Sequence, residues 1–328
     1  MSGRRILFIT KGERDSATRY RSLAYFDRLR ASGWDAVHMA AKATWRQRRK
    51  LLATAAAADV VVVQRKTFNP LFFHLLNSRC RRLVYDLDDA VFCRSDGTPS
   101  RTRARRFARI ARHCSQIWAG NTYLAETSKR YNASVRVLPT SLAPEKYAVE
   151  TQKPSGSIDL VWIGSRSTRK YLEPAVKIFD GVAARVPNLR LKIVADFDLA
   201  GHLLETAAIP WSESGEASAL ASAHIGVAPM PDNPWTRGKC ALKVIQYMAA
   251  GLPVVSSPAG VNGEVVEHGI SGFLAESPEQ WQAALLTLCR DENLRGKMGR
   301  MGRKRAAEDY SIQATFPKML AALGDLCA

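Results

Sequence analysis

Residues 224–259, HIGVAPMPDNPWTRGKCALKVIQYMAAGLPVVSSPA, contain a complete strand-loop-helix-strand unit. The first strand is the apolar run 225–228, and a loop in which Pro231 and Pro234 set the turns follows it. A helix of about a dozen residues is predicted next, ending at Gly251, and residues 252–255 form the second strand. This unit is typical of a parallel sheet, and its loop places a helix N-terminus at the carboxyl edge of that sheet.

The predicted helix carries one polar stripe on an otherwise apolar surface. Its long polar residues are Lys239, Lys243 and Gln246, and their spacing of four and seven positions puts them on one face. The spacing leaves two interpretations open. The stripe is either the solvated face of the helix or the lining of a cleft, with the helix N-terminus and two lysines facing an anion.

Short apolar strands alternate with helical stretches through the rest of the chain. In the first half, the predicted strands are residues 5–10, 36–39, 60–64, 83–87 and 117–119, with a helix expected over 19–32. In the second half, they are residues 160–163, 191–195, 225–228, 252–255 and a last stretch within 265–274. Continuous apolar strands separated by helices are typical of parallel sheets that are covered on both faces.

This pattern predicts an α/β fold with two tandem Rossmann-like, doubly wound domains that face each other across a ligand-binding cleft. The expected domains are residues 1–150 and 151–302, and the polar segment 145–157 is expected to link them.

Composition restricts the class of protein. Of the 328 residues, 46% are apolar and 24% are charged, as in an ordinary soluble globular protein. No run of about 18 apolar residues occurs, and the N-terminus lacks the apolar core of a signal peptide. The six cysteines form no C-x-x-C pair, so reduced thiols are expected rather than a metal site or disulfides. These features favour a cytoplasmic protein.

The net charge of +18 lies entirely in the first half. Residues 1–153 contain 30 Lys and Arg against 12 Asp and Glu, whereas residues 154–328 contain 18 of each. A half this basic is expected to bind a polyanion, namely an anionic membrane surface, a phosphorylated acceptor or a nucleic acid. Six arginines fall in residues 101–113, RTRARRFARIARH. The alanine-rich face of this predicted helix either lies among lipid headgroups or covers the sheet.

Four stretches resemble, in order, the group 1 glycosyltransferases of the GT-B fold, a family of retaining enzymes that use sugar nucleotides. They are LVYDLDDAVF (83–92), VWIGSRSTRKYL (161–172), GKCALKVIQYMAAGLPVVSS (238–257) and GVNGEVVEHGISGFL (260–274). The first is similar to the family's acceptor-side strand and loop, and the others to parts of its donor domain. The resemblance implies a GT-B fold in which a C-terminal helix, residues 303–328, packs back on the first domain.

The resemblance assigns the nucleotide sugar to the second domain. The diphosphate is expected at the N-terminus of the helix 238–250, where Lys239 and Lys243 neutralise it. The other donor-side candidates are Gly164, Ser165, Arg169, Lys170, Asp196, Phe197, Arg237, Gln246 and Glu264. Asp196 and Phe197 are expected near the base and Gln246 at the ribose. The resemblance implies neither a cofactor nor a metal.

The sequence departs from the family's pattern in the donor helix and in the acceptor-side loop. Where relatives commonly have two glutamates eight positions apart, this chain has Gly238 and Gln246, which resembles a subtype with the pattern GKC-x-x-K-x-x-Q-Y-M-A. Where many relatives have a histidine after the acceptor-side strand, this chain has Asp88, followed by Asp89.

Asp88 and Asp89 are the catalytic candidates of the first domain, beside Lys239 and Lys243 of the second. A carboxylate at Asp88 can bond to the donor sugar or assist the acceptor hydroxyl. Asp86-Leu87-Asp88 also spells the D-x-D of a metal-dependent glycosyltransferase fold, but the tandem pattern and the few oxygen ligands argue against a metal. Alternatively, the three aspartates are ion-pair partners of arginines.

The loop after the first predicted strand supplies two further candidates, Gly12 and Arg14, on the acceptor side. Their position is where the family's acceptor domain approaches the donor phosphates. Turn residues with no such role are the alternative.

Three functions follow from these observations. The leading one is transfer of a sugar from a UDP- or GDP-sugar to a glycan, glycolipid or polysaccharide in the cell envelope, at the anionic cytoplasmic face of the membrane. The second is a catalytically silent nucleotide-sugar-binding partner of an envelope assembly. The third, nucleic-acid binding, is disfavoured because the arginines are scattered and few aromatic residues lie among them.

Overall fold

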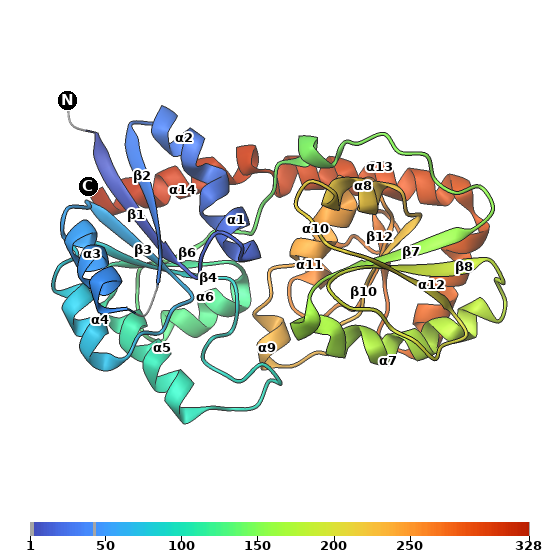
Figure 1. Cartoon of the computed structure of the whole chain (residues 1–328), viewed down its shortest axis with the longest axis horizontal. Helices are drawn as coiled ribbons and strands as arrows, with labels where there is room; N and C mark the ends of the chain where they lie inside the picture. Colours follow the sequence, from blue (N-terminus) through green and yellow to red (C-terminus); the bar gives the residue numbers. More distant parts are fainter. Residues whose placement is uncertain (1–2, 42–43, 328) are drawn as a thin grey trace. The chain divides into compact units, whose positions relative to one another are not determined.

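The structure, a computed structural model, describes residues 3–41 and 44–327. The chain divides into two compact units (Figure 1). Unit 1 contains Met1–Ser141, Asn233–Cys240 and Ile312–Ala328, and unit 2 contains Leu142–Asp232 and Ala241–Ser311. Within the described residues, each unit has a parallel sheet of six strands. The predicted α/β fold with two Rossmann-like domains is confirmed.

The sheet of unit 1 has the strand order β2-β1-β3-β4-β5-β6. Its strands are β1 (Arg4–Thr10), β2 (Trp34–Ala40), β3 (Val60–Gln64), β4 (Leu83–Leu87), β5 (Gln116–Ala119) and β6 (Val135–Val137). The first five match the predicted strands to within two residues. The sequence does not predict β6, because this edge strand has three residues, an arginine at its centre and no buried side chain.

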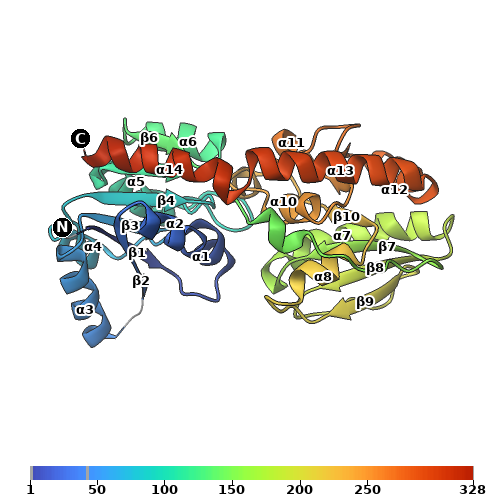
Figure 2. The same ribbon diagram turned by 90° about the horizontal axis from the view of Figure 1, so that it is seen from above.

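Helices cover both faces of this sheet (Figure 2). They are α1 (Ser16–Arg21), η1 (Leu23–Tyr25), α2 (Phe26–Ala31), α3 (Trp45–Ala56), α4 (Pro70–Asn77), α5 (Arg101–His113), α6 (Thr122–Lys129), α9 (Pro234–Arg237) and α14 (Ile312–Cys327). One face packs against α3 to α6, and the other against η1, α2 and α14. Leu7 and Ile9 of β1 enter the first core and Ile6 and Phe8 the second, which is why this strand is apolar throughout.

The single helix expected over 19–32 is wrong. Ser22 has φ −124° and ψ −73°, outside the helical range, and it separates α1 from η1 and α2. Beyond this break, the hydroxyl of Tyr25 contacts Ser141 Oγ at 2.5 Å and Thr315 Oγ1 at 2.8 Å. The apolar periodicity continues across the break, so the sequence gives no sign of it.

The arginine-rich segment 101–113 forms α5, whose N-cap is Ser100. Its apolar residues Phe107, Ile110 and Ala111 are buried in the core that α5 shares with α3 and α4. The apolar face therefore covers the sheet, as one of the two sequence interpretations predicts.

The sheet of unit 2 has the strand order β12-β11-β10-β7-β8-β9. Its strands are β7 (Ile158–Ile163), β8 (Leu189–Val194), β9 (Glu205–Ile209), β10 (Ile225–Ala228), β11 (Val254–Ser256) and β12 (Gly272–Leu274). The sequence does not predict the edge strand β9, because its residues, ETAAI, are largely exposed and weakly apolar. β11 begins only after Pro253, which has no N–H for the ladder.

The helices of unit 2 are η2 (Pro144–Tyr147), α7 (Arg166–Ala183), α8 (Glu216–Ala221), α10 (Leu242–Ala249), α11 (Asn262–Val265), α12 (Pro278–Arg290) and α13 (Glu292–Asp309). α7 and α12 pack on the sheet face that Ile225 and Val227 of β10 enter. α10 lies over the opposite face, where a Cβ at Gly226 would come within 2.5 Å of the Tyr247 ring. Glycine is required there because the helix approaches the strand so closely.

Among the described residues, no helix combines the length and the apolar character needed to cross a membrane. All six cysteines lie in the described part of the chain, and all are free thiols.

Candidate active site

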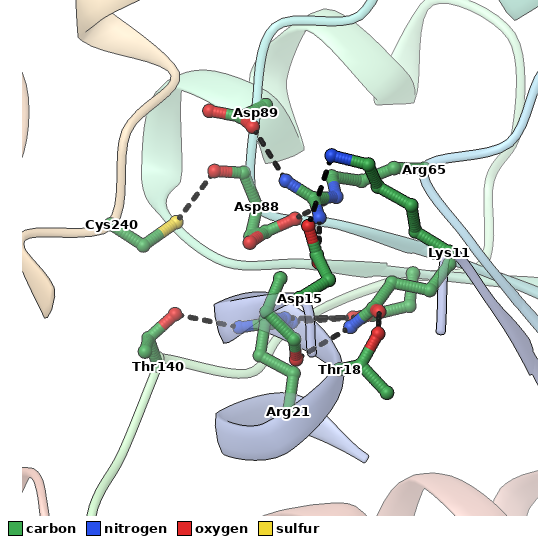
Figure 3. A network of polar contacts seen from close by, with 12 residues as sticks. Lys11, Asp15, Thr18, Arg21, Arg65, Asp88, Asp89, Thr140 and Cys240 are labelled. Atoms are coloured by element: carbon green, nitrogen blue, oxygen red, sulfur yellow. Dashed lines mark hydrogen bonds and ion pairs between the residues drawn. The ribbon is translucent and has the colours of Figure 1, made fainter. Parts of the chain in front are cut away.

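Acidic and basic side chains meet where two neighbouring strands of unit 1 end (Figure 3). β3 and β4 are parallel, and Gln64 pairs in register with Asp86, so the chain leaves both strands at the same edge of the sheet. Arg65 directly follows β3, while Asp88 and Asp89 follow β4. The carboxyl edge of a doubly wound sheet is where such folds bind ligands.

Arg65 is the centre of this cluster. Its guanidinium contacts Asp15, Asp88 (Nε to Oδ1, 3.2 Å) and Asp89 (Nη1 to Oδ2, 2.9 Å). The backbone of Arg65 is left-handed, with φ 55°, and its N–H donates to the carbonyl oxygen of Asp86 (2.9 Å). Burial alone would lower the pKa of Arg65, but the three carboxylates outweigh it and raise the pKa above its usual value. Arg65 is therefore a permanent cation that fixes three carboxylates.

Asp88 is the carboxylate whose protonation the cluster alters. Its side chain is only 13% exposed, and this burial raises the pKa of Asp88 to about 6. The charge of Arg65 opposes the effect of burial, and the neighbouring Asp89 adds to it. A carboxyl group with a pKa close to neutrality can both accept and return a proton at physiological pH.

Asp86, within β4, belongs to a separate buried ion pair. Arg21 Nη2 lies 2.5 Å from Asp86 Oδ1, and Arg21 also donates to the carbonyl oxygen of Leu138 (2.8 Å) and to Thr140 Oγ1 (3.2 Å). Asp86 and Asp88, the two acids of the D-x-D pattern, thus both face arginines. In the described residues, no three His, Cys, Asp or Glu side chains are placed to hold a metal ion. Asp86, Asp88 and Asp89 therefore all form ion pairs with arginines, as the alternative interpretation predicts.

Residues 233–240 also pack within unit 1, beside this cluster. Lys239 Nζ lies 3.3 Å from Asp89 Oδ1. Asn121 Nδ2 donates to the carbonyl oxygens of Arg237 (3.1 Å) and Lys239 (3.0 Å), which fixes this segment, while the side chain of Arg237 is exposed.

Gly238 occupies one of the two positions where relatives have glutamate, and the structure gives a steric reason for the glycine. A Cβ at this position would lie 2.6 Å from the backbone nitrogen of Ala90 and 2.7 Å from its Cβ. No side chain fits there unless the loop that carries Asp88 and Asp89 moves.

The continuous helix expected over 238–250 is wrong. The structure has α9, an irregular turn and then α10, and Ala241 before α10 has φ 52°. A left-handed residue interrupts a right-handed helix. Lys239 therefore lies outside α10, which begins at Leu242, and the predicted polar stripe of three residues does not form.

In unit 2, cationic and aromatic side chains gather at the carboxyl ends of β7 and β8. Lys243 Nζ lies 4.2 Å from a ring centroid of Trp162, and Arg169 Cζ lies 5.3 Å from that of Phe197. The rings of Trp162 and Phe197 meet edge to face, with centroids 5.7 Å apart. These four residues form one continuous aromatic–cation cluster at the edge where a doubly wound sheet binds ligands.

The loop after β7 holds three further candidates. A Cβ at Gly164 would come within 2.2 Å of the Trp162 ring, so this position excludes a side chain. Ser165 is the N-cap of α7, and its N–H donates to Thr168 Oγ1 (3.1 Å). Lys170 extends over the ring of the next residue, with Nζ 5.2 Å from the centroid.

Asp196 and Glu264 lie in separate parts of unit 2. Arg166 Nε donates to Asp196 Oδ2 (3.2 Å) just after β8. Glu264 is exposed in α11, and its carbonyl oxygen accepts a hydrogen bond from Arg305 Nη2 (2.9 Å).

In unit 1, the loop after β1 places Gly12 and Arg14 close to Asp15 in the chain. Gly12 has φ 131°, a conformation that favours glycine, and the side chain of Arg14 is exposed. In the same loop, Lys11 Nζ lies 3.5 Å from Asp15 Oδ1.

Gln246 is buried, and its amide is engaged within unit 2. Nε2 donates to Glu216 Oε1 (2.7 Å) and to the hydroxyl of Tyr147 (3.0 Å), which itself donates to the same Glu216 oxygen (2.5 Å). Trp211 Nε1 donates to the other Glu216 oxygen (2.7 Å). The segment expected to be a linker thus begins as an ordered part of unit 2, and in this structure Gln246 is a core contact rather than an open ribose ligand.

The motifs in the sequence do not point to Arg65, Arg21, Trp162 or Arg166. The position of Arg65 could have been predicted, because this residue directly follows the strand with four valines and therefore lies at the carboxyl edge of the sheet. The Arg21–Asp86 pair joins residues 65 positions apart, and no local pattern reports such a contact.

The raised pKa of Asp88 predicts a pH dependence of stability. A folded-state pKa near 6, above the ordinary 3.8, means that the folded protein binds this proton more tightly than the unfolded chain. The resulting stabilisation is complete below about pH 4 and is lost as the pH rises through about 6. Asp88→Asn cannot ionise and therefore does not lose this stabilisation. As the pH rises between these values, the free energy of unfolding of Asp88→Asn minus that of the wild type should increase by roughly 2–3 kcal/mol.

Urea unfolding of both proteins across this pH range measures the gain. Asp96→Asn is the matched control, because Asp96 is exposed and hydrogen bonds from Thr98 lower its pKa instead of raising it. A difference between Asp88→Asn and wild type that does not change with pH would contradict the raised pKa.

Residues 157–291 match the model of the family described as Glycosyl transferases group 1. This segment contains every strand of unit 2 and the aromatic–cation cluster. Spore coat protein SA of Bacillus subtilis (strain 168) is 31% identical to this chain over 78 residues. That match spans 23% of this chain and only 21% of the Bacillus protein.

Solved structures of similar fold cover nearly the whole chain. Sucrose-phosphate synthase from Thermosynechococcus elongatus has a TM-score of 0.75 and 13% identity, over 98% of this chain and 99% of its own. Anabaena HepE in complex with UDP and glucose has a TM-score of 0.74 and 15% identity, over 98% of this chain and 100% of its own. A glycosyltransferase from Rickettsia africae ESF-5 has a TM-score of 0.76 and 11% identity, over 100% of this chain and 99% of its own. The chain therefore has the two-domain GT-B fold, and its residues 157–291 match the group 1 glycosyltransferase family.

Proposed function

We propose that this protein is a retaining, metal-independent glycosyltransferase that transfers a sugar from a UDP- or GDP-sugar to a glycan, glycolipid or polysaccharide acceptor in cell-envelope biosynthesis. The family match over residues 157–291 and the GT-B fold support glycosyl transfer from a nucleotide sugar. The complex of HepE with UDP and glucose favours a UDP donor. The retaining outcome follows from the family that the motifs resemble.

The aromatic–cation cluster carries this proposal, because it is built for an anion and lies within the family-matched segment. Lys243 and Arg169 lie against the rings of Trp162 and Phe197 at the carboxyl edge of β7 and β8, and Arg169 Nε also donates to Glu173 Oε1 (2.7 Å), which fixes its guanidinium group beside the ring. The 18-residue helix α7 begins beside them at Ser165 and adds N–H groups and a favourable dipole. Negative charge accumulates on the leaving diphosphate as the glycosidic bond breaks, so these cations act most strongly in the transition state.

In this proposal, Asp88 handles the proton of the acceptor. The bond between the sugar C1 and the diphosphate oxygen breaks, a bond from C1 to the acceptor oxygen forms, and the hydroxyl proton has to leave. Asp88 is a suitable base for this proton, because its pKa of about 6 leaves it largely ionised at neutral pH yet able to hold the proton. Asp89 lies between Arg65 and Lys239 and positions the loop. Glu264, exposed on α11, takes over the ribose contact that the buried Gln246 does not make.

The proposed acceptor is held at the anionic cytoplasmic face of a membrane, to which the protein attaches peripherally. α3 and α5 carry four and six Lys or Arg residues, and neither these helices nor α4 between them contains Asp or Glu. Trp45 at the start of α3 and Leu71 on α4 are each 72% exposed. Exposed apolar side chains among cations are typical of proteins that bind anionic lipid surfaces.

Nucleotide binding tests the donor site. We expect either UDP or GDP, in a panel with ADP and dTDP, to raise the melting temperature by several degrees, since a ligand at 100 times its Kd stabilises by about 2.7 kcal/mol. Lys243→Ala should lose most of this shift, whereas Lys177→Ala, which removes an exposed lysine of α7, should keep it. A full shift in Lys243→Ala would place the diphosphate elsewhere, and no shift with any nucleotide would refute the donor site.

Turnover tests catalysis separately from binding. With the nucleotide sugar whose base binds, Asp88→Asn should keep the thermal shift but slow transfer, or hydrolysis of the donor, by about 10²–10⁴-fold. The wild-type rate should rise through a pH of about 6, as Asp88 ionises. Asp96→Asn should match the wild type. A wild type that binds the donor without hydrolysing or transferring it would be a silent partner rather than an enzyme.

A further inference from the structure

A hollow of about 480 Å³ lies on the surface of unit 1, between α5 and Tyr131. Four of its lining side chains are basic, namely Arg105, Arg109, Arg112 and His113, and none is acidic. These residues follow the spacing i, i+4, i+7 and i+8, so they share one face of α5. The hollow uses none of the residues assigned above to the donor or to the proton, and its arginines belong to the basic surface of α5 that the proposed function places at the membrane.

Packing contacts and hydrogen bonds fix the part of the hollow that Tyr131 lines. Ala104 and Ala108 line it, and their short side chains leave the space between the arginines open. The ring of Tyr131 packs edge-on against Phe107, with centroids 5.6 Å apart. The next residue, Asn132, donates from Nδ2 to two carbonyl oxygens at the end of α5, at 2.9 and 2.8 Å.

The arginines of the hollow lack anionic partners. In the described part of the chain, Arg105, Arg109 and Arg112 make no ion pair, and Arg109 Nη1 is buried without a hydrogen-bond acceptor. A buried donor with no partner is rare in folded proteins, and guanidinium groups bond most strongly to carboxylate and phosphate oxygens. Arg112 is already held in place, since its Cζ lies 5.1 Å from the centroid of Tyr131. These features describe a preformed site for an anion.

We infer that this hollow binds a phosphate group that carries an organic substituent. Planar guanidinium groups match phosphate oxygens, and the volume exceeds what a bare phosphate ion fills. Nucleic acid fits less well, because Arg112 already covers the Tyr131 ring on which a base would stack. The phosphate comes either from a soluble phosphorylated compound or from a phospholipid headgroup, and the same contacts serve both.

Charge-matched variants of α5 test the site on the full-length protein. Arg109→Gln removes the buried donor, and Arg106→Gln removes the same charge from the same helix outside the hollow. The soluble probes are inorganic phosphate and glycerol 3-phosphate, titrated by calorimetry at fixed ionic strength. The membrane probes are phosphatidylcholine vesicles with and without phosphatidylglycerol, assayed by flotation. If Arg109→Gln fails to fold by circular dichroism, the double variant Arg105→Gln/Arg112→Gln replaces it, with Arg101→Gln/Arg106→Gln as its control.

We expect Arg109→Gln to weaken binding of the responsive probe by about tenfold or more and Arg106→Gln to change it by less than about twofold. Binding of glycerol 3-phosphate identifies a soluble ligand, whereas flotation with anionic but not neutral vesicles identifies a lipid headgroup. Either result supports the site if Arg109→Gln impairs the binding and Arg106→Gln does not. Equal losses in both variants would reveal general electrostatic attraction and overturn the inference. Binding of no probe, or equal binding to neutral vesicles, would overturn it as well.

Discussion

The contact of one guanidinium group, that of Arg65, with three carboxylates is the interaction on which the edge of unit 1 depends. Asp15, Asp88 and Asp89 come from two loops, and their mutual repulsion would separate them if no cation lay between them. Removing one partner from such a buried group typically costs about 3–5 kcal/mol, because uncompensated charges stay behind. The left-handed backbone of Arg65 is a second cost, which its ion pairs and its hydrogen bond to Asp86 offset.

This arrangement also sets the chemistry of the edge. Burial raises the pKa of Asp88, and Arg65 limits the rise, so the carboxyl group titrates near pH 6 instead of staying protonated. Asp89 has two cations beside it, Arg65 and Lys239, and Asp86 has its own arginine. Three acids within four positions of the chain therefore have three different environments. That separation of environments lets one carboxyl group exchange a proton while its neighbours hold the loop.

Most of the fold is predictable from the sequence, because the strands that form both sheets are buried on two faces. Runs such as Val60–Gln64 and Leu83–Leu87 are apolar without alternation, and the structure places them at the predicted residues. The strands that the sequence does not predict are the edge strands β6 and β9, whose side chains are largely exposed. Backbone breaks are equally invisible, since Ser22 and Ala241 interrupt helices whose apolar spacing continues across them.

The candidate site is less predictable, because its chemistry depends on contacts between distant residues. Asp88, Asp89 and Lys243 are predicted as site residues from the sequence, and the structure places them at the carboxyl edges of the two sheets. The sequence does not show that Lys239 lies outside the helix and pairs with Asp89. Nor does it show that the amide of Gln246 is hydrogen-bonded to Glu216 and Tyr147. The lack of space for a side chain at position 238, next to Ala90, is equally hidden. Each of these depends on tertiary packing, which local spacing does not encode.

The balance between burial and Arg65 at Asp88 is the central claim, and a titration of the Asp88 carboxyl carbon by NMR tests it most directly. The wild type should show a pKa near 6, and Arg65→Gln should show a higher value, because the cation that lowers the pKa has been removed while the burial remains. A wild-type value near 3.8, or a pKa that does not rise in Arg65→Gln, would contradict the account.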